Sequence, residues 1–230
     1  MIKRLIYIAV VLTCSYPDFA ASQTFINPNY SIKSHETLEI RKIETTTEAV
    51  IIHLSLENRI VGGSFCADKN LFIVYPDGTS SRLTSAKDIP VCPDTHKFNA
   101  TGEKIVFTLK FPPLGKDIRW IDLIEDCSEN CFSFYGIILD DDLNKKIDEA
   151  FLFADNGDPG NALDSFLKIA ESNGKSNTGI DGLLFINIIS LARETGNHVM
   201  AAEWYQRMTS SGNPRIHLFI RHLNDQGIKY

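Results

Sequence analysis

The sequence predicts an α+β protein of two modules, with an antiparallel β-sandwich over residues 23–139 and an α-helical repeat module over residues 140–230. Three observations support this prediction. Residues 36–139 contain about seven short runs in which apolar and polar residues alternate, and no helical spacing separates them. From residue 143 onward the apolar residues recur every three or four positions instead. Between the two patterns, residues 118–143 have the features of a hairpin whose arms end in cysteines, followed by an acidic helix start.

The N-terminal residues 1–22 have the features of a secretory signal peptide. Two basic residues precede an apolar run over residues 5–13, which is too short for a stable transmembrane helix, and small residues at 20–22 offer a cleavage site. A buried N-terminal strand is the alternative. Cys14 raises a further alternative, a lipid anchor, although Thr13 before it is not the residue that lipoprotein signals usually carry. We therefore expect an exported protein, periplasmic, on the cell surface or secreted.

The charge balance bears on the partners that we expect. Removing residues 1–22 leaves 21 basic and 28 acidic residues, a net charge of −7. A chain of this charge is repelled by nucleic acid and by anionic membrane surfaces, so neither is expected as the main partner. No other apolar run approaches the roughly eighteen residues of a transmembrane helix.

An even number of cysteines in an exported chain predicts disulfides. Four cysteines allow three connectivities, and we favour the one whose two disulfides join sequence neighbours, for which loop entropy gives roughly 3.5 and about 2 kcal/mol. The alternatives are a four-cysteine zinc site, which the spacing does not favour, and a redox-active C-x3-C, whose acidic neighbours would raise a thiol pKa. The favoured pairs are Cys66–Cys92 and Cys127–Cys131.

Each strand is predicted from alternation between turn signals. In residues 50–56 and again in 104–111 every second side chain is apolar, which indicates strands that are buried on one face. Pro76–Thr79 is a strong turn signal, and residues 23–34 are expected to be a polar lead-in. The predicted strands are the one that begins at Leu38, followed by 50–56, 71–75, 80–84, 104–111, 118–125 and 132–139.

Short strands, turn signals and an exported context favour an antiparallel sandwich of immunoglobulin-like type. The segment resembles β-sandwich domains that precede other modules in exported bacterial proteins, through the stretches TTTEAVIIHLSL, FPPL, WIDLIE and FYGI. The Cys–Trp–Cys spacing of true immunoglobulin domains is absent, because Trp120 follows the first two cysteines. The resemblance covers residues 36–139 and implies no catalytic residues.

The helical module is predicted to contain about five helices. Asp140–Asp142 can cap the first, whose apolar face runs from Leu143 to Ala154. A calcium site is the alternative for these aspartates, but no EF-hand spacing follows. Gly157 ends this helix, and the last helix would cap the array. The expected helices begin near Asp140, Pro159, Ile180, Val199 and Ile216.

The module repeats itself with a period of 39 positions, which pairs Gly157 with Gly196. It resembles tetratricopeptide repeats through A-x6-G-D-x3-A-x3-F-x2-I-A from Ala150 and A-x3-G-x4-A-x3-Y from Ala192. In that family a small residue lets two helices pack closely and an aromatic residue fills the groove between them. The period exceeds the usual 34 residues, so a plain pair of helical hairpins is the alternative. The resemblance gives the packing roles to Ala162, Phe166, Ala201 and Tyr205.

No motif of known catalytic chemistry is present: no G-x-S-x-G, no H-E-x-x-H, no P-loop and no G-x-G-x-x-G. We assign no catalytic, cofactor-binding or metal-binding residue. His53 is expected to be solvated, and a polar hairpin turn accounts for the adjacent carboxylates Glu125 and Asp126. One face of the last helix is expected to be solvated, with a small anion-binding patch as the alternative; this face carries Arg215, His217, Arg221 and His222.

We therefore expect an exported, non-enzymatic binding or adaptor protein whose helical module holds another protein or a peptide on its concave face. One alternative is a glycan-binding module in which sugar rings stack on Phe72, Tyr75 or Trp120. The competing interpretation of these three aromatic residues is that they fill the hydrophobic core. A second alternative is a hydrolase whose site assembles from distant residues. A pocket with a perturbed carboxylate or histidine would support it.

Overall fold

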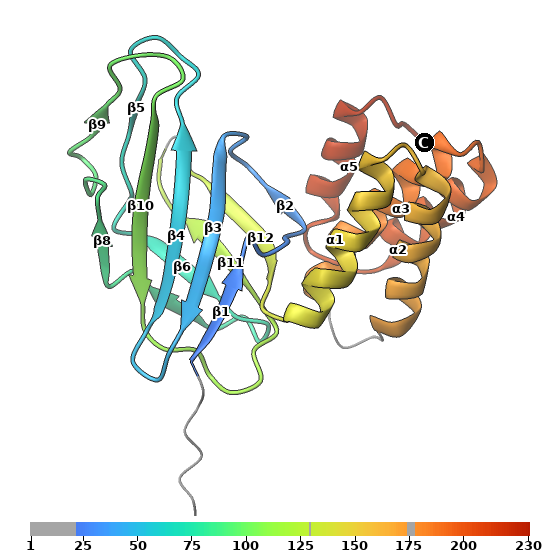
Figure 1. Ribbon diagram of the computed structural model, residues 1–230, viewed down its shortest axis with the longest axis horizontal. Helices are drawn as coiled ribbons and strands as arrows, with labels where there is room; N and C mark the ends of the chain where they lie inside the picture. The colour runs from blue at the N-terminus through green and yellow to red at the C-terminus, as the bar shows by residue number, and fades with distance from the viewer. Residues whose placement is uncertain (1–21, 129, 174–177) are drawn as a thin grey trace, which may run out of the picture.

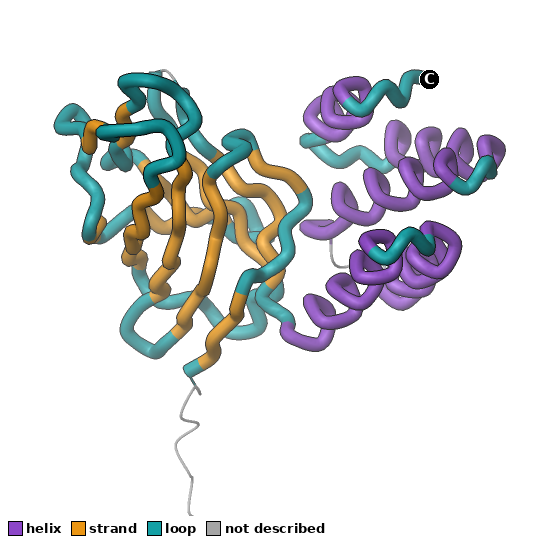
Figure 2. The backbone as a smooth tube through the Cα atoms, turned by 45° about the horizontal axis from the view of Figure 1, so that its top comes forward, coloured by secondary structure: helices purple, strands orange, loops and turns teal. Residues whose placement is uncertain are grey.

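The computed structural model describes residues 22–128, 130–173 and 178–230. The predicted signal peptide therefore lies outside the described residues except for Ser22, and so does Cys14. The fold is α+β: antiparallel sheets come first along the chain and helices follow (Figure 1). Figure 2 shows the strands and the helices as two bodies lying side by side. The change falls between the last strand, which ends at Ile138, and the first helix, which begins at Asp141.

Two five-stranded antiparallel sheets form the first body, in the orders β1-β3-β4-β10-β8 and β2-β12-β11-β6-β7, and β5 and β9 form a small third sheet. The twelve strands in the described ranges are β1 (Gln23–Ile26), β2 (Ile32–Lys33), β3 (Leu38–Thr45), β4 (Val50–Glu57), β5 (Ser64–Phe65), β6 (Leu71–Val74), β7 (Ser80–Arg82), β8 (Ser85–Lys87), β9 (His96–Lys97), β10 (Lys104–Phe111), β11 (Trp120–Glu125) and β12 (Ser133–Ile138).

The sandwich core is built by the alternation that the sequence shows. Strands β4 and β10 pair antiparallel with Leu54 opposite Phe107 and Ile52 opposite Leu109, and all four side chains are fully buried. One apolar cluster joins these residues to buried side chains of the second sheet, so the two sheets share a single interior. Side chains that alternate with them point to the other face of the sheet.

The structure has more strands than the seven or so expected. The additional ones, β1, β2, β5, β8 and β9, are four residues long or shorter. Residues 23–34, expected to be a lead-in, contain two of them: β1 pairs with β3, and β2 pairs with β12. Such short strands are held by main-chain pairing, β1, β2 and β8 with a longer neighbour and β5 and β9 with each other, and they are too short to show apolar alternation, which is why the pattern does not predict them.

The structure pairs the cysteines as Cys66–Cys92 and Cys127–Cys131, with S–S distances of 1.99 and 2.01 Å. The first disulfide joins the segment after β5 to the segment before β9, and a bridge between Ala67 and Val91 lies directly beside it. The second closes the hairpin between β11 and β12. Both therefore fasten loops of the sandwich.

In the described part of the chain five α-helices form the second body. Asp140 caps the first through a hydrogen bond from the Leu143 N–H to its carboxylate at 3.0 Å, and Asn197 caps the fourth in the same way through the Met200 N–H. The helices are α1 (Asp141–Asp155), α2 (Pro159–Asn173), α3 (Asp181–Glu194), α4 (His198–Ser210) and α5 (Ile216–Asp225), and a 3₁₀ turn, η1 (Thr178–Ile180), precedes α3.

The four residues that the repeat resemblance singled out lie in two different surroundings. Ala162, Phe166 and Ala201 are fully buried in one cluster, and the Phe166 ring meets Phe151 edge to face at 5.2 Å. Tyr205 belongs to a second cluster, is half-buried and stacks on Tyr230 at 4.7 Å. Phe166 therefore packs between α1 and α2, whereas Tyr205 packs against the C-terminal residues.

Within the described ranges, no helix combines the length and the apolar character needed to cross a membrane.

Candidate functional site at the junction of sheet and helices

The face formed by α1, η1 and α5 is covered by the protein's own chain. Residues 29–34, which include β2, the edge strand of the second sheet, lie against these helices (Figure 1). The Asn29 N–H donates to the Asn144 Oδ1 of α1 at 2.9 Å, and the Ser31 hydroxyl donates to the Gly179 carbonyl of η1 at 2.6 Å. Further along, Ile32 packs on the cluster that contains Phe219 of α5. This side of the helices therefore already holds an extended segment of the same chain.

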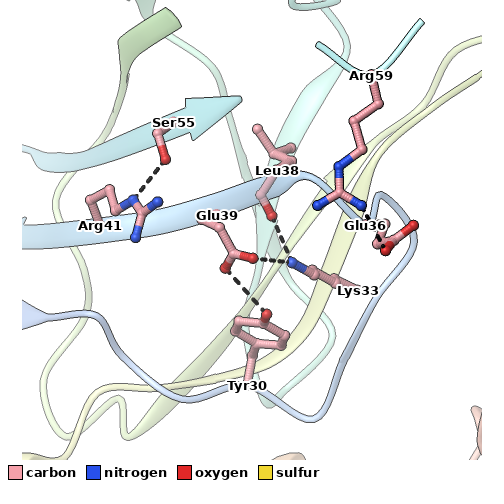
Figure 3. Close-up of polar contacts among 8 residues, drawn as sticks. All are labelled: Tyr30, Lys33, Glu36, Leu38, Glu39, Arg41, Ser55 and Arg59. Carbon is pink, nitrogen blue, oxygen red and sulfur yellow. Dashed lines mark hydrogen bonds and ion pairs between the residues drawn. The ribbon is translucent and has the colours of Figure 1, made fainter. Parts of the chain in front are cut away.

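The same segment is fixed to the sandwich on its other side (Figure 3). The Lys33 ammonium donates to the Leu38 carbonyl at 3.0 Å and forms an ion pair with Glu39 at 2.5 Å. The Tyr30 hydroxyl lies 3.5 Å from the Glu39 carboxylate, and burial together with that carboxylate raises the pKa of Tyr30. Residues 29–34 are thus held from both bodies, which makes them part of the junction.

A buried ion pair lies at the centre of the junction. Arg215, directly before α5, donates to the Asp122 carboxylate of β11, and the Asp122 side chain is 0% exposed and that of Arg215 20%. The Gly136 N–H also donates to Asp122, at 2.7 Å. The guanidinium of Arg215 lies 5.6 Å from the ring centroid of Trp120 and 5.0 Å from that of Tyr135. Burial raises the pKa of Asp122 against the opposing pull of Arg215 and the Gly136 amide. The charge of Arg215 is therefore compensated within the protein.

Two glycines allow the sheet and the helices to approach closely. Gly136 of β12 has φ of +64°, and a Cβ there would lie 2.0 Å from the Gly179 carbonyl oxygen. A Cβ on Gly179 would lie 2.2 Å from the ring of Trp120. A side chain at either position would collide with the opposite body. Glycine therefore allows the backbone of β12 to approach the backbone of η1, and the backbone of η1 to approach the Trp120 indole.

A cavity of about 340 Å³ opens beside this ion pair. Its walls come from both bodies. The sandwich supplies the end of β6, the turn after it and the ring of Trp120, and the helical module supplies the start of α3 and the α4–α5 loop. We call this cavity the junction pocket, and its lining residues are Val74, Tyr75, Pro76, Gly78, Trp120, Asp181, Ser211, Gly212, Asn213, Pro214 and Arg215.

Asp181 gives the junction pocket its charge. It is the first residue of α3, it is half-buried, and in the described part of the chain no hydrogen bond or ion pair reaches its carboxylate. Burial alone raises its pKa to about 6. Asp122, by contrast, is paired with Arg215 and receives a backbone N–H. Of these two carboxylates, Asp122 is satisfied by the protein, and Asp181 lines the pocket with no partner among the described residues.

Glu125 and Asp126, considered as a carboxylate pair from the sequence, lie in different surroundings. Glu125 is 8% exposed and accepts hydrogen bonds from the N–H groups of Asp68 at 2.7 Å and Phe132 at 3.1 Å, and burial raises its pKa. Asp126 is exposed. Glu125 is therefore a structural acceptor that joins a sandwich loop to the β11–β12 hairpin. Sequence alternation gave no sign of that role.

The remaining residues considered from the sequence are dispersed. His53 was expected to be solvated, but it is half-buried and its Nε2 lies 2.7 Å from the Glu44 carboxylate. On α5 His217 and Arg221 are exposed. His222 is half-buried, and burial lowers its pKa. Because Arg215 instead enters the junction, these four basic residues do not form one patch.

The three aromatic residues proposed as stacking platforms also separate. Tyr75 and Trp120 line the junction pocket, whereas Phe72 lies outside it, with the Arg82 guanidinium 6.0 Å from its ring centroid. Trp120 is only 7% exposed, because Gly179 lies against its ring and Arg215 lies over it. The indole can offer an edge to the pocket, but it has little free face on which a sugar could stack.

Sequence reasoning did not single out Asp122, Gly136, Gly179 or Asp181. A signal was available for Asp122, which is the one charged residue inside the otherwise apolar run of β11 before Glu125. None was available for Asp181, since an aspartate at a helix start is ordinary. Among the residues that the structure describes, no group of three or more His, Cys, Asp or Glu side chains is arranged to hold a metal ion.

Comparison with known proteins adds no family: no family model, no curated protein and no solved structure matches this chain.

Proposed function

We propose that this is an exported, non-enzymatic binding protein that receives part of a partner protein in the junction pocket. The observation that carries the proposal is the pocket itself, because its walls come from both bodies and it contains a carboxylate that has no partner among the described residues. Natural proteins rarely bury an ionisable group without a partner unless the group has a functional role. A volume of about 340 Å³ suits one side chain or a chain end.

Three further points support this role. The two disulfides suit a protein of an oxidising compartment, as the predicted signal peptide also implies. The helical hairpins α1–α2 and α3–α4 support a tetratricopeptide-like module, and the two facing sheets support an immunoglobulin-like sandwich. Both folds are common carriers of protein recognition. Since residues 29–34 already lie against α1 and η1, a partner would reach the helical module elsewhere, where the α4–α5 loop borders the pocket.

The two alternatives gain less support. Glycan binding would need an open aromatic face, and Trp120 is largely covered. Hydrolysis by a carboxylate pair would need two accessible carboxylates. The junction pocket does contain a carboxylate of raised pKa, Asp181, but Asp122 is 0% exposed and paired with Arg215, so among the described residues no second carboxylate lines the pocket.

A peptide-display selection against the full-length chain tests the proposal. Ser211 lines the pocket and is exposed, so Ser211→Trp places an indole at its mouth. The neighbouring Ser210 is exposed but lies outside the lining, and Ser210→Trp is the matched control. We expect selected peptides to bind the chain and Ser210→Trp equally and to lose at least about tenfold in affinity for Ser211→Trp. Peptides that bind all three proteins equally, or a selection that enriches none, would contradict the proposal.

A further inference from the structure

We propose that the junction pocket recognises a basic side chain of the partner, lysine or arginine, whose cationic group pairs with Asp181 while its methylene stem lies along Trp120 and Tyr75. This inference rests on the proposed function and specifies the chemistry of the group that enters the pocket.

The charges around the pocket point to a cation. Among the described residues, two charged side chains line it, Asp181 and Arg215. The positive charge of Arg215 is compensated by Asp122 beneath it, so within that part of the chain the negative charge of Asp181 is uncompensated. An anion would be repelled by Asp181 and would have to compete with Asp122 for Arg215. A cation meets no such competition, because the Asp181 carboxylate has no partner in the described part of the chain.

The rest of the lining suits the stem of a basic side chain. Lysine and arginine carry an apolar stem of three or four carbons below the charge, and such stems favour apolar and aromatic surfaces. Tyr75, Pro76, Trp120 and Val74 provide that surface on the sandwich side. Selectivity over an uncharged aliphatic side chain would then come from Asp181.

The free-energy cost of partly burying the Asp181 carboxylate in the free protein supports a binding role. Burial without a partner disfavours the ionised carboxylate, as its raised pKa shows. A cation in the pocket would remove that penalty, because an ion pair in a partly desolvated site is stronger than the same pair in water. The free protein would accept a local loss of stability and recover it upon binding, as binding sites commonly do.

Small probes test the inference without a partner protein. In full-length Trp204→Phe, Trp120 is the remaining tryptophan, because the chain contains two. Its indole N–H signal in an NMR titration therefore reports on the junction pocket. The probes are the Nα-acetyl methylamides of lysine, arginine and norleucine. We expect the lysine or the arginine probe to shift this signal with a Kd of order millimolar, and norleucine to leave it unchanged at equal concentration.

Variants at Asp181 complete the test. Asp181→Asn should weaken the basic probe by at least about tenfold, and Asp181→Glu, which keeps the charge, should bind within a few fold of the unmodified chain. The control is Asp164→Asn, which neutralises an exposed carboxylate of α2 and should bind like the unmodified chain. Retained affinity in Asp181→Asn, or equal shifts from norleucine, would overturn the inference.

The two proposals fail in different ways. If display peptides lose affinity for Ser211→Trp but not for Asp181→Asn, the pocket binds a partner through another group and the present inference is wrong. If the basic probes bind through Asp181 but no peptide is selected, the cation site stands and its role in protein binding is wrong.

Discussion

The interior of the sandwich and the junction between sandwich and helices are both buried, but they differ in chemistry. The interior is filled by apolar side chains such as Phe107, Leu54 and Ile73, all 0% exposed. The junction also contains apolar contacts, from Ile138 and Ile32 to the helical clusters, but it adds an ion pair, two close-approach glycines and side-chain amides. Strand β11 takes part in both, because Ile121 and Leu123 face the sandwich core while Trp120 and Asp122 face the helices.

The two regions differ in how strictly they fix the positions of the groups that they join. An apolar interior tolerates exchange of one large side chain for another at modest cost, whereas polar contacts fix position and leave a penalty when one partner is lost. The junction should therefore set one relative placement of the two bodies. That placement forms the junction pocket, since its walls belong to both. Four predictions test this comparison.

The largest effect is expected from breaking the ion pair. Arg215→Met leaves Asp122 buried without its partner and should lower the free energy of unfolding by about 3–5 kcal/mol. Urea titrations followed by Trp120 fluorescence in Trp204→Phe would measure the loss. Arg221→Met, at an exposed position of α5, should change little. In a double-mutant cycle, Asp122→Asn combined with Arg215→Met should cost less than the sum of the single changes. Additive losses would contradict a coupled pair.

A methyl group at Gly136 should have the next largest effect. Gly136→Ala adds a Cβ to a residue with φ of +64° and places it 2.0 Å from the Gly179 carbonyl oxygen. We expect a loss of about 3 kcal/mol, from backbone strain and from separation of the two bodies. Gly102→Ala is the control, with φ of +86° and no atom within 4 Å of the added Cβ, and should cost only about 1–2 kcal/mol. Equal losses, measured by urea unfolding, would show that the close approach is unimportant.

Loss of a junction amide should have a smaller effect. Asn144 accepts from the Asn29 N–H at 2.9 Å and donates to the Ile138 carbonyl at 3.1 Å, and it is buried. Asn144→Ala leaves these backbone groups without their partner and should cost about 1–3 kcal/mol in thermal or urea unfolding. Asn156→Ala, at the exposed end of α1, is the reference. Hydrogen exchange at Asn29 should accelerate in Asn144→Ala only. An unchanged exchange rate would contradict the tie between this segment and α1.

The smallest effect is a gain. Folding raises the pKa of Asp181 from an ordinary 3.8 to about 6, so the folded state favours the protonated carboxyl. This preference stabilises the folded state at low pH, and the stabilisation is lost as pH rises from about 3.8 to about 6. Asp181→Asn should therefore be more stable than the unmodified chain at pH 7.5, by about 1–2 kcal/mol after allowance for partial exposure. The gain should vanish near pH 4. Thermal unfolding at both pH values measures it, and a gain independent of pH would point to a cause other than ionisation.

Sequence periodicity predicted the elements that bury one regular face. The strand over residues 104–111 has its expected bounds, and the helix expected at Pro159 begins there, because a missing N–H is tolerated in a first helical turn. The short strands β5, β8 and β9 gave no such pattern. The same limit applies to the junction pocket. Asp181 and Trp120 are far apart in the sequence, and their surroundings depend on how two bodies meet.

The sequence by itself determined the order of sheet and helix, the repeating spacing of the helical residues and an even set of cysteines suited to disulfides. Each follows from local rules, since side-chain period and turn chemistry act over a few neighbouring residues. Only the tertiary structure decided that residues 29–34 lie against α1, η1 and α5, that Arg215 compensates Asp122, and that Asp181 has no partner among the residues that the structure describes. These are contacts between segments about 90 to 150 positions apart, such as Asp122 with Arg215 and Ser31 with Gly179, and no local pattern encodes which distant groups will meet.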